Sequence, residues 1–353
     1  MTFRWVDSAR REILSSDPAA RRQIVAYLWY PSRSRRGVPL APYLPDFAAL
    51  RAAVGDSALG RLARAGRLRV HARDDAPFAD EPRRHPLLIF SPGIGETALA
   101  YSTILEDLAS HGYVVAALEH PFDALGADVA GGDVVPFAER AWDAATAAGA
   151  DSTIGYLKSR VQVWADDSRF ALDALAHGAI ASHLDLERIG AFGHSLGGLA
   201  TVRLCQLDAR VRACANQDSD YRGVPLFDYG DGARLVQPFL FIASDHSLII
   251  AKHTPPPDAR LRRQQAAQDS ALNAVAGGSW RVGVETPGFT HHSFMDLPLL
   301  GAPADSSAPL LLNLRIVRTY TRAFFDRCLR GVRPTALDAA TPLAADVTVQ
   351  RFH

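Results

Sequence analysis

The pattern G-H-S-L-G at residues 193–197 constrains the fold more than any other stretch of the chain. An apolar run precedes it at residues 189–192, and a helix-like run follows at residues 199–204. The sequence therefore predicts a strand, a tight turn that carries a serine, and a helix, which is the pattern of a nucleophile elbow. Glycines suit this turn because the serine backbone is strained and the strand and helix must approach closely. The pattern indicates that Ser195 is a nucleophile.

Alternating strand and helix patterns extend this unit into a larger sheet. Short apolar runs that predict strands lie at residues 23–30, 87–90, 113–118, 211–216, 239–243 and 280–284. Helical patterns lie at residues 98–110, 153–177, 257–275 and 309–329. Such alternation is typical of a mostly parallel sheet with helices on both faces. We therefore expect an α/β-hydrolase fold as a single domain over residues 1–353, with the run from Trp280 to Val284 as its last strand and a surface tail after the last helix.

Two segments interrupt the alternation and are candidate cap segments. Residues 32–85 are rich in proline and arginine, and residues 122–150 are rich in glycine and alanine. Within the first segment, apolar residues at helical spacing from Phe47 to Leu62 predict one helix. We expect this helix to form a lid over the site, and the alternative is a helix that docks on a membrane surface. The balanced charge and the lack of an aromatic cluster favour the lid.

The charge balance gives no sign of a strongly charged partner. Lys plus Arg and Asp plus Glu both number 38, so the formal net charge is zero and nothing points to nucleic acid. Cys205, Cys214 and Cys328 form an odd and sparse set rather than a disulfide framework. We expect Cys205 and Cys214 to be buried as small apolar side chains.

The chain also lacks the sequence features of a membrane-spanning or exported protein. No uninterrupted apolar run approaches the length of a membrane span, which leaves only peripheral lipid contact. Residues 1–7 lack the apolar core of a signal peptide. We expect a cytoplasmic protein, although a trimmed secreted form would look the same.

A serine nucleophile needs a base, and histidine suits because its pKa lies near neutrality. In the α/β-hydrolase fold the chain order is serine, acid, histidine. Candidate bases after the serine are His246, His253, His291, His292 and His353. The pair at residues 291–292 follows the last predicted strand, where this fold carries its base. Only one of two adjacent residues can point into one site.

Two aspartates are candidates for the acid that orients the histidine and stabilises its charged form. Asp245 follows the predicted strand at residues 239–243, which is the commoner position of the acid in this fold. Asp218 follows the preceding predicted strand. Spacing alone does not choose between them.

The oxyanion hole requires two backbone N–H groups that point to the developing negative charge. One belongs to the residue after the nucleophile, Leu196. The other is expected in the loop after the strand at residues 87–90, where Gly93 and Gly95 flank Ile94. The chain has no H-E-x-x-H motif, Walker loop or dinucleotide-binding glycine pattern. We therefore expect neither a metal nor another cofactor.

Six stretches of the chain form a recognisable set: LWYPS at 28–32, LLIFSPGIG at 87–95, YSTILEDLASHGYVVAALEHP at 101–121, AFGHSLGG at 191–198, RACANQD at 212–218 and HHSFMDLP at 291–298. Through them the chain resembles the platelet-activating-factor acetylhydrolase family of α/β-hydrolases, including its bacterial esterase members. The stretches span most of residues 22–330.

The resemblance implies a role for each of the candidate site residues. Ser195 matches the nucleophile, and His291, in a pattern H-x-x-F-x-D, matches the base. Asp218 matches the acid, while the nearby Asp220 keeps that assignment open. Ile94 matches the second oxyanion donor.

The resemblance has two departures that bear on the substrate. The chain has Pro92 where the family often has histidine beside the oxyanion hole. The segments 32–85 and 122–150 match the family poorly, so the phospholipid substrate of the family is not carried over.

Together these features predict a serine hydrolase that cleaves a small carboxylic ester through an acyl-enzyme, without a cofactor. The branched side chains of Ile94 and Leu196 beside the oxyanion hole, together with the resemblance, favour acyl groups from acetyl to butyryl. One alternative is acyl transfer, or amide or lactone cleavage, at the same site. The other is a catalytically silent binding module, which the complete serine, aspartate and histidine set disfavours.

Overall fold

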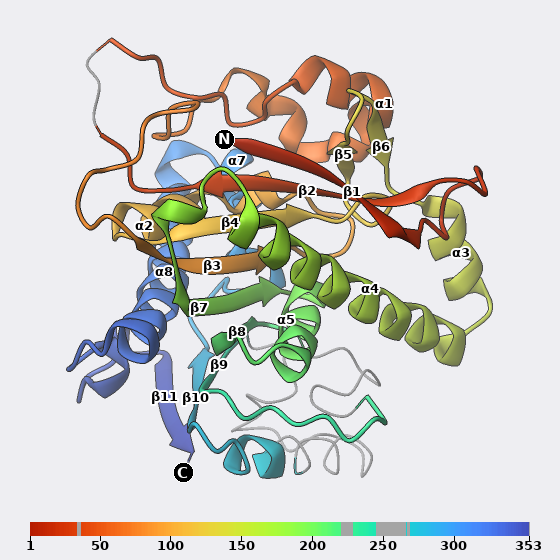
Figure 1. The fold of residues 1–353 in the computed structure, drawn as a ribbon. Helices are drawn as coiled ribbons and strands as arrows, with labels where there is room; N and C mark the ends of the chain where they lie inside the picture. Colours follow the sequence, from red (N-terminus) through yellow and green to blue (C-terminus); the bar gives the residue numbers. More distant parts are fainter. Residues whose placement is uncertain (34–36, 220–228, 245–265, 267–268, 353) are drawn as a thin grey trace.

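A mostly parallel sheet forms the centre of the computed structural model (Figure 1). The structure describes residues 1–33, 37–219, 229–244, 266 and 269–352. In this part of the chain the sheet has nine strands, in the order β1-β2-β4-β3-β7-β8-β9-β10-β11. The strands from β4 to β10 in this order are parallel, whereas β1, β2 and β11 pair antiparallel at the two sides. The expected mostly parallel sheet is confirmed.

The strands of the sheet are β1 Thr2–Arg11, β2 Arg21–Trp29, β3 His85–Ser91, β4 Val114–Glu119, β7 Leu184–His194, β8 Val211–Gln217, β9 Phe239–Ser244, β10 Ser279–Val284 and β11 Val347–Phe352. The main helices are α1 Phe47–Leu59, α2 Ser102–Ser110, α3 Glu139–Ala147, α4 Ala150–His177, α5 Leu196–Leu207, α7 Leu297–Leu300 and α8 Ser307–Arg330. The helix expected over residues 257–275 lies largely outside the described residues. Among the helices described, none is both long and apolar enough to cross a membrane.

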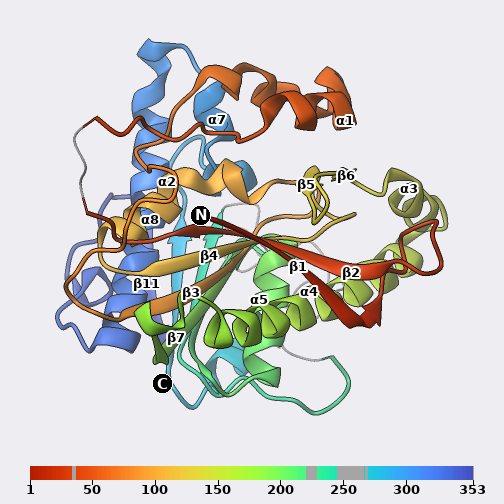
Figure 2. The same ribbon diagram turned by 45° about the horizontal axis from the view of Figure 1, so that its top comes forward.

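Helices cover both faces of the sheet (Figure 2). Its central strands are therefore buried on both sides. Side chains of β3 alternate between two apolar clusters. Leu87 and Ile89 share one cluster with residues of α4 and α5. Leu88 and Phe90 share the other with residues of α2 and α8. This packing fixes the carboxyl ends of the strands, where the candidate site lies.

The two candidate cap segments pack against each other. The short hairpin of β5 (Gly126–Asp128) and β6 (Val134–Pro136) lies beside α1 in both views (Figures 1 and 2). A Cβ atom on Gly126 would lie 2.6 Å from Leu50 Cδ1, so a larger residue here would require the Leu50 side chain to shift. The single helix expected from Phe47 to Leu62 is instead α1 followed by a 3₁₀ helix, η1 (Gly60–Arg67), and α1 itself is kinked at Gly55, whose φ is 77°. The role of these segments as a cap stays a prediction.

Two edge strands, β1 and β11, were not expected from the sequence. β1 pairs with β2, and β11 pairs with β10 in a register that places Val349 opposite Val282. The expectation that the sheet ends at Val284 and that a tail follows on the surface is therefore wrong. Edge strands bury fewer side chains, so their sequences lack the apolar runs that mark the central strands.

Cys205 and Cys214 form a disulfide, which corrects the expectation that they are reduced apolar side chains. Both are buried, as expected. They lie near the end of α5 and in β8, with Cα atoms 6.6 Å apart. The chain reverses between that helix and the next strand, which brings the two cysteines, nine residues apart, together. Cys328 in α8 is a free thiol.

Candidate active site

Ser195 lies between β7 and α5, in the turn that the sequence predicts. Its φ is 57° and its ψ is −128°, a conformation that side-chain-bearing residues rarely adopt. A Cβ atom on Gly193 would lie 2.3 Å from the carbonyl oxygen of Gly197, and one on Gly197 would lie 2.1 Å from that of Ser91. The glycines on both sides of the serine are therefore required by close backbone contacts.

His291 joins Ser195 to Asp218 through two hydrogen bonds. Its Nε2 atom lies 2.9 Å from Ser195 Oγ, and its Nδ1 atom lies 2.8 Å from Asp218 Oδ2. Ser195 and Asp218 are almost fully buried, whereas the histidine, in the loop after β10, is partly exposed. The structure thus brings together the three side chains that the sequence singled out.

Asp218 is fixed from a second side by Ser244 at the end of β9. The Ser244 N–H donates to Oδ1 at 2.7 Å, and the Ser244 hydroxyl donates to Oδ2 at 2.8 Å. These bonds hold the carboxylate toward the imidazole of His291. The alternative acids, Asp220 and Asp245, lie outside the described residues, as do His246, His253 and His353.

The backbone N–H groups of the loop after β3 differ in whether they have a protein acceptor. The N–H of Gly93 donates to the Tyr101 phenol at 3.1 Å, that of Gly95 to a backbone carbonyl at 2.7 Å, and that of Glu96 to the Gly93 carbonyl at 3.2 Å. Within the described residues, the N–H of Ile94 has no protein acceptor. Ile94 thus differs from Gly93, Gly95 and Glu96, whose N–H groups are used within the protein.

A second N–H group is supplied by Leu196, the first residue of α5. Its position at the helix N-terminus adds the favourable end of the helix dipole to a developing negative charge. The loop approaches the elbow closely, since a Cβ atom on Gly93 would lie 3.3 Å from Ser195 Cβ. The loop and the helix N-terminus therefore flank the same hydroxyl.

Sequence reasoning missed a link between this loop and the elbow, made by Tyr101 and His194. The Tyr101 phenol accepts the N–H of Gly93 and lies within hydrogen-bond distance of His194 Nδ1, at 2.7 Å. Burial and the neighbouring His291 lower the pKa of His194 well below its usual value, which favours the neutral imidazole. The His194 ring packs on the His291 ring with centroids 4.5 Å apart. No sequence motif indicates this link, because the sequence around Tyr101 is typical of an ordinary helix.

Ser91, His120 and Asp167 form a second serine–histidine–aspartate row, which is sealed in the interior. His120 lies 3.3 Å from Ser91 Oγ and 2.8 Å from Asp167 Oδ2, while Arg22 pairs with the same aspartate at 2.6 Å. All four side chains are buried, so no substrate reaches them. This row is part of the support beneath the loop after β3.

A cavity of about 320 Å³ adjoins the loop of His291. Its apolar lining comes from Ala58, Leu59, Leu62, Leu125 and Leu297. Its polar lining comes from Arg61, Glu96 and His292. The first candidate cap segment, the loop after β3 and the histidine loop thus share one cavity.

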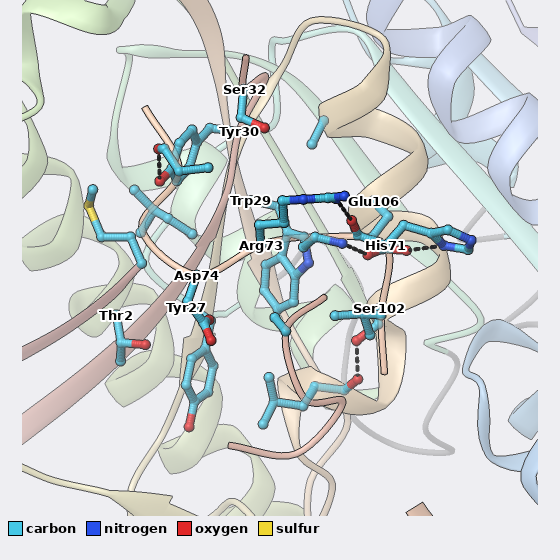
Figure 3. A pocket seen from close by; sticks show the side chains of 18 of the residues that line it. Thr2, Tyr27, Trp29, Tyr30, Ser32, His71, Arg73, Asp74, Ser102 and Glu106 are labelled. Atoms are coloured by element: carbon cyan, nitrogen blue, oxygen red, sulfur yellow. Dashed lines mark hydrogen bonds and ion pairs between the residues drawn. The ribbon is translucent and has the colours of Figure 1, made fainter. Parts of the chain in front are cut away.

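A separate cavity of about 310 Å³ lies between β2 and α2 (Figure 3). Figure 3 shows Tyr27 and Trp29 of β2 in its lining, together with Glu106, which lies 3.1 Å from His71 Nδ1. None of the residues that line it belongs to the hydrogen-bonded row of Ser195. Among the described residues, no group of three metal-binding side chains is gathered at either cavity or elsewhere.

Comparison with known proteins identifies the relatives of the chain. Residues 16–127 match the family model described as platelet-activating factor acetylhydrolase, isoform II. A probable 1-alkyl-2-acetylglycerophosphocholine esterase of Arthroderma benhamiae is 27% identical over 312 residues, which cover 83% of this chain and 74% of that protein. The platelet-activating factor acetylhydrolase of Canis lupus familiaris is 31% identical over 182 residues, 46% of this chain and 40% of that protein. The chain thus spans less than half of the dog protein that it matches.

A solved structure covers nearly the whole chain. The ferulic acid esterase of Streptomyces cinnamoneus superposes with a TM-score of 0.76 and 28% identity, over 99% of this chain and 94% of that chain. This similarity confirms the α/β-hydrolase fold. The named relatives confirm the resemblance to the platelet-activating-factor acetylhydrolases and esterases.

Proposed function

Because the chain is a carboxylic ester hydrolase related to the platelet-activating-factor acetylhydrolases, we propose that Ser195, His291 and Asp218 are its catalytic triad. The observation that carries the proposal is the unbroken row of hydrogen bonds, 2.9 Å from Ser195 to His291 and 2.8 Å from His291 to Asp218. Ile94 and Leu196 are the proposed oxyanion donors.

In the proposed reaction, Ser195 Oγ attacks the ester carbonyl carbon while its proton passes to His291 Nε2. The carbonyl oxygen becomes an oxyanion and accepts hydrogen bonds from the N–H groups of Ile94 and Leu196. The imidazolium, stabilised by Asp218, then protonates the departing alkoxide oxygen, and the C–O bond breaks to leave an acyl-serine. Water repeats the sequence, with His291 as base, and releases the carboxylic acid.

The proposed substrates are esters of short acyl groups, from acetyl to butyryl. The fungal relative's name includes an acetyl ester, and Ile94 and Leu196 place branched side chains beside the proposed oxyanion site. Each methylene that fits an apolar pocket adds about 0.8 kcal/mol of binding. We expect kcat/KM to fall beyond butyryl in a series of p-nitrophenyl esters, and a steady rise to dodecanoyl would contradict the proposal.

Labelling with an organophosphonate tests the nucleophile. Intact mass spectrometry is expected to show one adduct on the wild type and none on Ser195→Ala. The matched control is Ser91→Ala, because Ser91 also has a histidine partner but is sealed in the interior. Labelling that persists in Ser195→Ala, or that disappears in Ser91→Ala alone, would overturn the assignment. Release of free acid and alcohol separates hydrolysis from acyl transfer.

We infer that the helix region from α1 to η1 is a lid rather than a membrane anchor. Leu50, Leu59 and Leu62, which make up much of the predicted apolar stripe, are buried against the rest of the chain. A stripe that is used in internal packing is not available to lipid. The protein is expected to stay in the supernatant when phosphatidylcholine vesicles are sedimented. Co-sedimentation with the vesicles would favour peripheral membrane docking.

For the cellular compartment, the disulfide argues against the cytoplasmic location that the sequence favoured. Cysteine pairs persist in oxidising compartments and are rare in the cytosol. We propose that the chain works in an oxidising compartment. Localisation of the epitope-tagged protein by cell fractionation tests this.

A further inference from the structure

Glu96 is a carboxyl group beside the nucleophile for which the proposed mechanism has no use. Its Cγ atom lies 3.4 Å from the position that a Cβ atom on Gly93 would take, and the same position is 3.3 Å from Ser195 Cβ. The Glu96 side chain therefore starts close to the same glycine that Ser195 approaches. It also lines the cavity of about 320 Å³ that adjoins the histidine loop.

The carboxyl group of Glu96 is poorly hydrated and is not used to hold the fold together. Burial raises its pKa to about 7, and the nearby His291 opposes that rise. In the part of the chain that the structure describes, its carboxyl oxygens accept no hydrogen bond. A partly buried polar group without a protein partner inside a cavity is free to bind a polar group of a ligand.

We propose that Glu96 binds a hydroxyl group on the alcohol portion of the ester, so that the enzyme prefers esters of polyhydroxylated alcohols over alkyl esters of equal length. This inference rests on the proposed function, because it assumes that Ser195 is the nucleophile and His291 the base.

The position of the cavity relative to His291 favours the alcohol portion. The departing oxygen must lie within hydrogen-bond reach of His291 Nε2, because it takes the proton from that atom. The cavity is bounded by His292 and Leu297, which follow this base in the chain. The positive charge of the His291 imidazolium also acts on Glu96, where it lowers the pKa of the carboxyl group. The alcohol portion, which leaves beside His291, is thus the part of the ester that we assign to the cavity lined by Glu96.

The charges around the cavity favour a neutral partner. Arg61 lines the cavity on the side of the cap segment, and its charge helps to lower the pKa of His292, after burial and His291. A cationic substrate group would meet the Arg61 guanidinium, and an anionic one would meet Glu96. A hydroxyl avoids both penalties, since it donates to a carboxylate and also pairs with a carboxylic acid.

A pair of esters that differ only in hydroxyl groups tests the proposal. The wild type is expected to favour 2,3-dihydroxypropyl acetate over propyl acetate by about tenfold in kcat/KM, the effect of one or two hydrogen bonds. In Glu96→Leu this ratio is expected to fall to about one, whereas Glu96→Gln is expected to keep part of it because an amide still accepts and donates. The ratio is measured within one preparation, so it does not depend on the folded fraction.

The matched control is Glu139→Leu, which removes an exposed glutamate at the start of α3 and is expected to leave the ratio unchanged. Two further ester pairs separate the alternatives. Acetylcholine against 3,3-dimethylbutyl acetate tests a cationic group, and methyl glycolate against methyl acetate tests a hydroxyl on the acyl side. A preference confined to either of these pairs would overturn the proposal.

Failure of the inference is distinguishable from failure of the proposed function. A wild type that cleaves p-nitrophenyl acetate but shows a ratio near one, or a Glu96→Leu variant with the wild-type ratio, overturns the role of Glu96 alone. A wild type that cleaves none of these esters, although correctly folded by circular dichroism, overturns both.

Discussion

The phenol oxygen of Tyr101 accepts the N–H of Gly93 at 3.1 Å, so a side chain outside the proposed triad fixes the backbone beside the proposed oxyanion donor. The same oxygen lies 2.7 Å from Nδ1 of His194, the residue before Ser195. One hydroxyl thus sets the distance between the loop after β3 and the elbow. The Tyr101 hydroxyl is not part of the proposed oxyanion hole, but it holds the backbone next to one of its donors in place.

Tyr101→Phe is expected to lower kcat about tenfold with little change in KM. The substitution removes the acceptor of the Gly93 N–H, and a misplaced oxyanion donor weakens the transition state more than the bound substrate. Steady-state kinetics with p-nitrophenyl acetate measures the effect. Tyr113→Phe is the matched control, since it removes a buried tyrosine's hydrogen bond to Asp326 (2.8 Å) at the N-terminal end of β4. An equal loss of kcat in both variants would show that only stability is affected.

Asp218→Asn is expected to lower kcat by about 10⁴-fold while the fold is retained. Asparagine has nearly the same shape but does not stabilise the imidazolium charge on His291. Asp220→Asn and Asp245→Asn, the two alternative acids, are expected to stay within a few-fold of the wild type. If Asp245→Asn has the large effect instead, the acid occupies the commoner position of the fold.

The contribution of Glu119 to the stability of the protein is expected to fall as the pH rises from about 5 to about 8. This carboxyl at the end of β4 is fully buried, and burial raises its pKa from 4.5 to about 8. The folded state holds the proton up to pH 8, whereas the unfolded chain releases it near pH 4.5, so this contribution is greatest at acid pH.

Glu119→Gln tests this source of pH dependence, because the amide keeps an acceptor for the N–H of Ala98 but does not ionise. From pH 5.5 to pH 8.5 the Tm of the variant is expected to fall less, or rise more, than that of the wild type, by several degrees in differential scanning fluorimetry. The exposed Glu187→Gln is the control and is expected to keep the wild-type slope. Equal slopes in all three proteins would refute the role of Glu119.

Loss of the disulfide is expected to destabilise the protein by about 2–3 kcal/mol, the loop-entropy value for a short closed loop. Cys205 and Cys214 are nine residues apart. The double substitution to alanine is expected to lower the midpoint of urea unfolding, and Cys328→Ala serves as the control. Thiol titration of the unfolded wild type is expected to find one thiol without reductant and three with it, and three in both cases would contradict the pairing.

The central sheet could be predicted from the sequence because its strands are buried on both faces. The apolar run of β3, with Leu87 to Phe90 all buried, needs no partner information to be recognised. β1 could not be found in this way, since most of its side chains are at least partly exposed and its only signal is the pairing with β2. The kink at Gly55 was hidden for a similar reason, because apolar spacing does not report backbone angles.

The candidate site was predictable where its chemistry is tied to chain order, and not where it depends on distant contacts. Ser195 follows from an elbow motif, and the position after the last parallel strand limits the base to the pair at residues 291–292, from which the family resemblance selects His291. Asp218 needed the family resemblance, because spacing left Asp245 equally open. Glu96 and Tyr101 carry no motif, and their importance comes only from the residues that the fold places beside them.

Ser195 and Asp218 share a backbone angle, with φ at 57° in both. A β-branched side chain is strongly disfavoured at such an angle. Cysteine, which branches no more than serine, fits the elbow, whereas threonine does not, although threonine carries the same hydroxyl group. A cysteine nucleophile could therefore arise in this scaffold by evolution or engineering. A threonine nucleophile is excluded by the shape of its side chain and not by its reactivity.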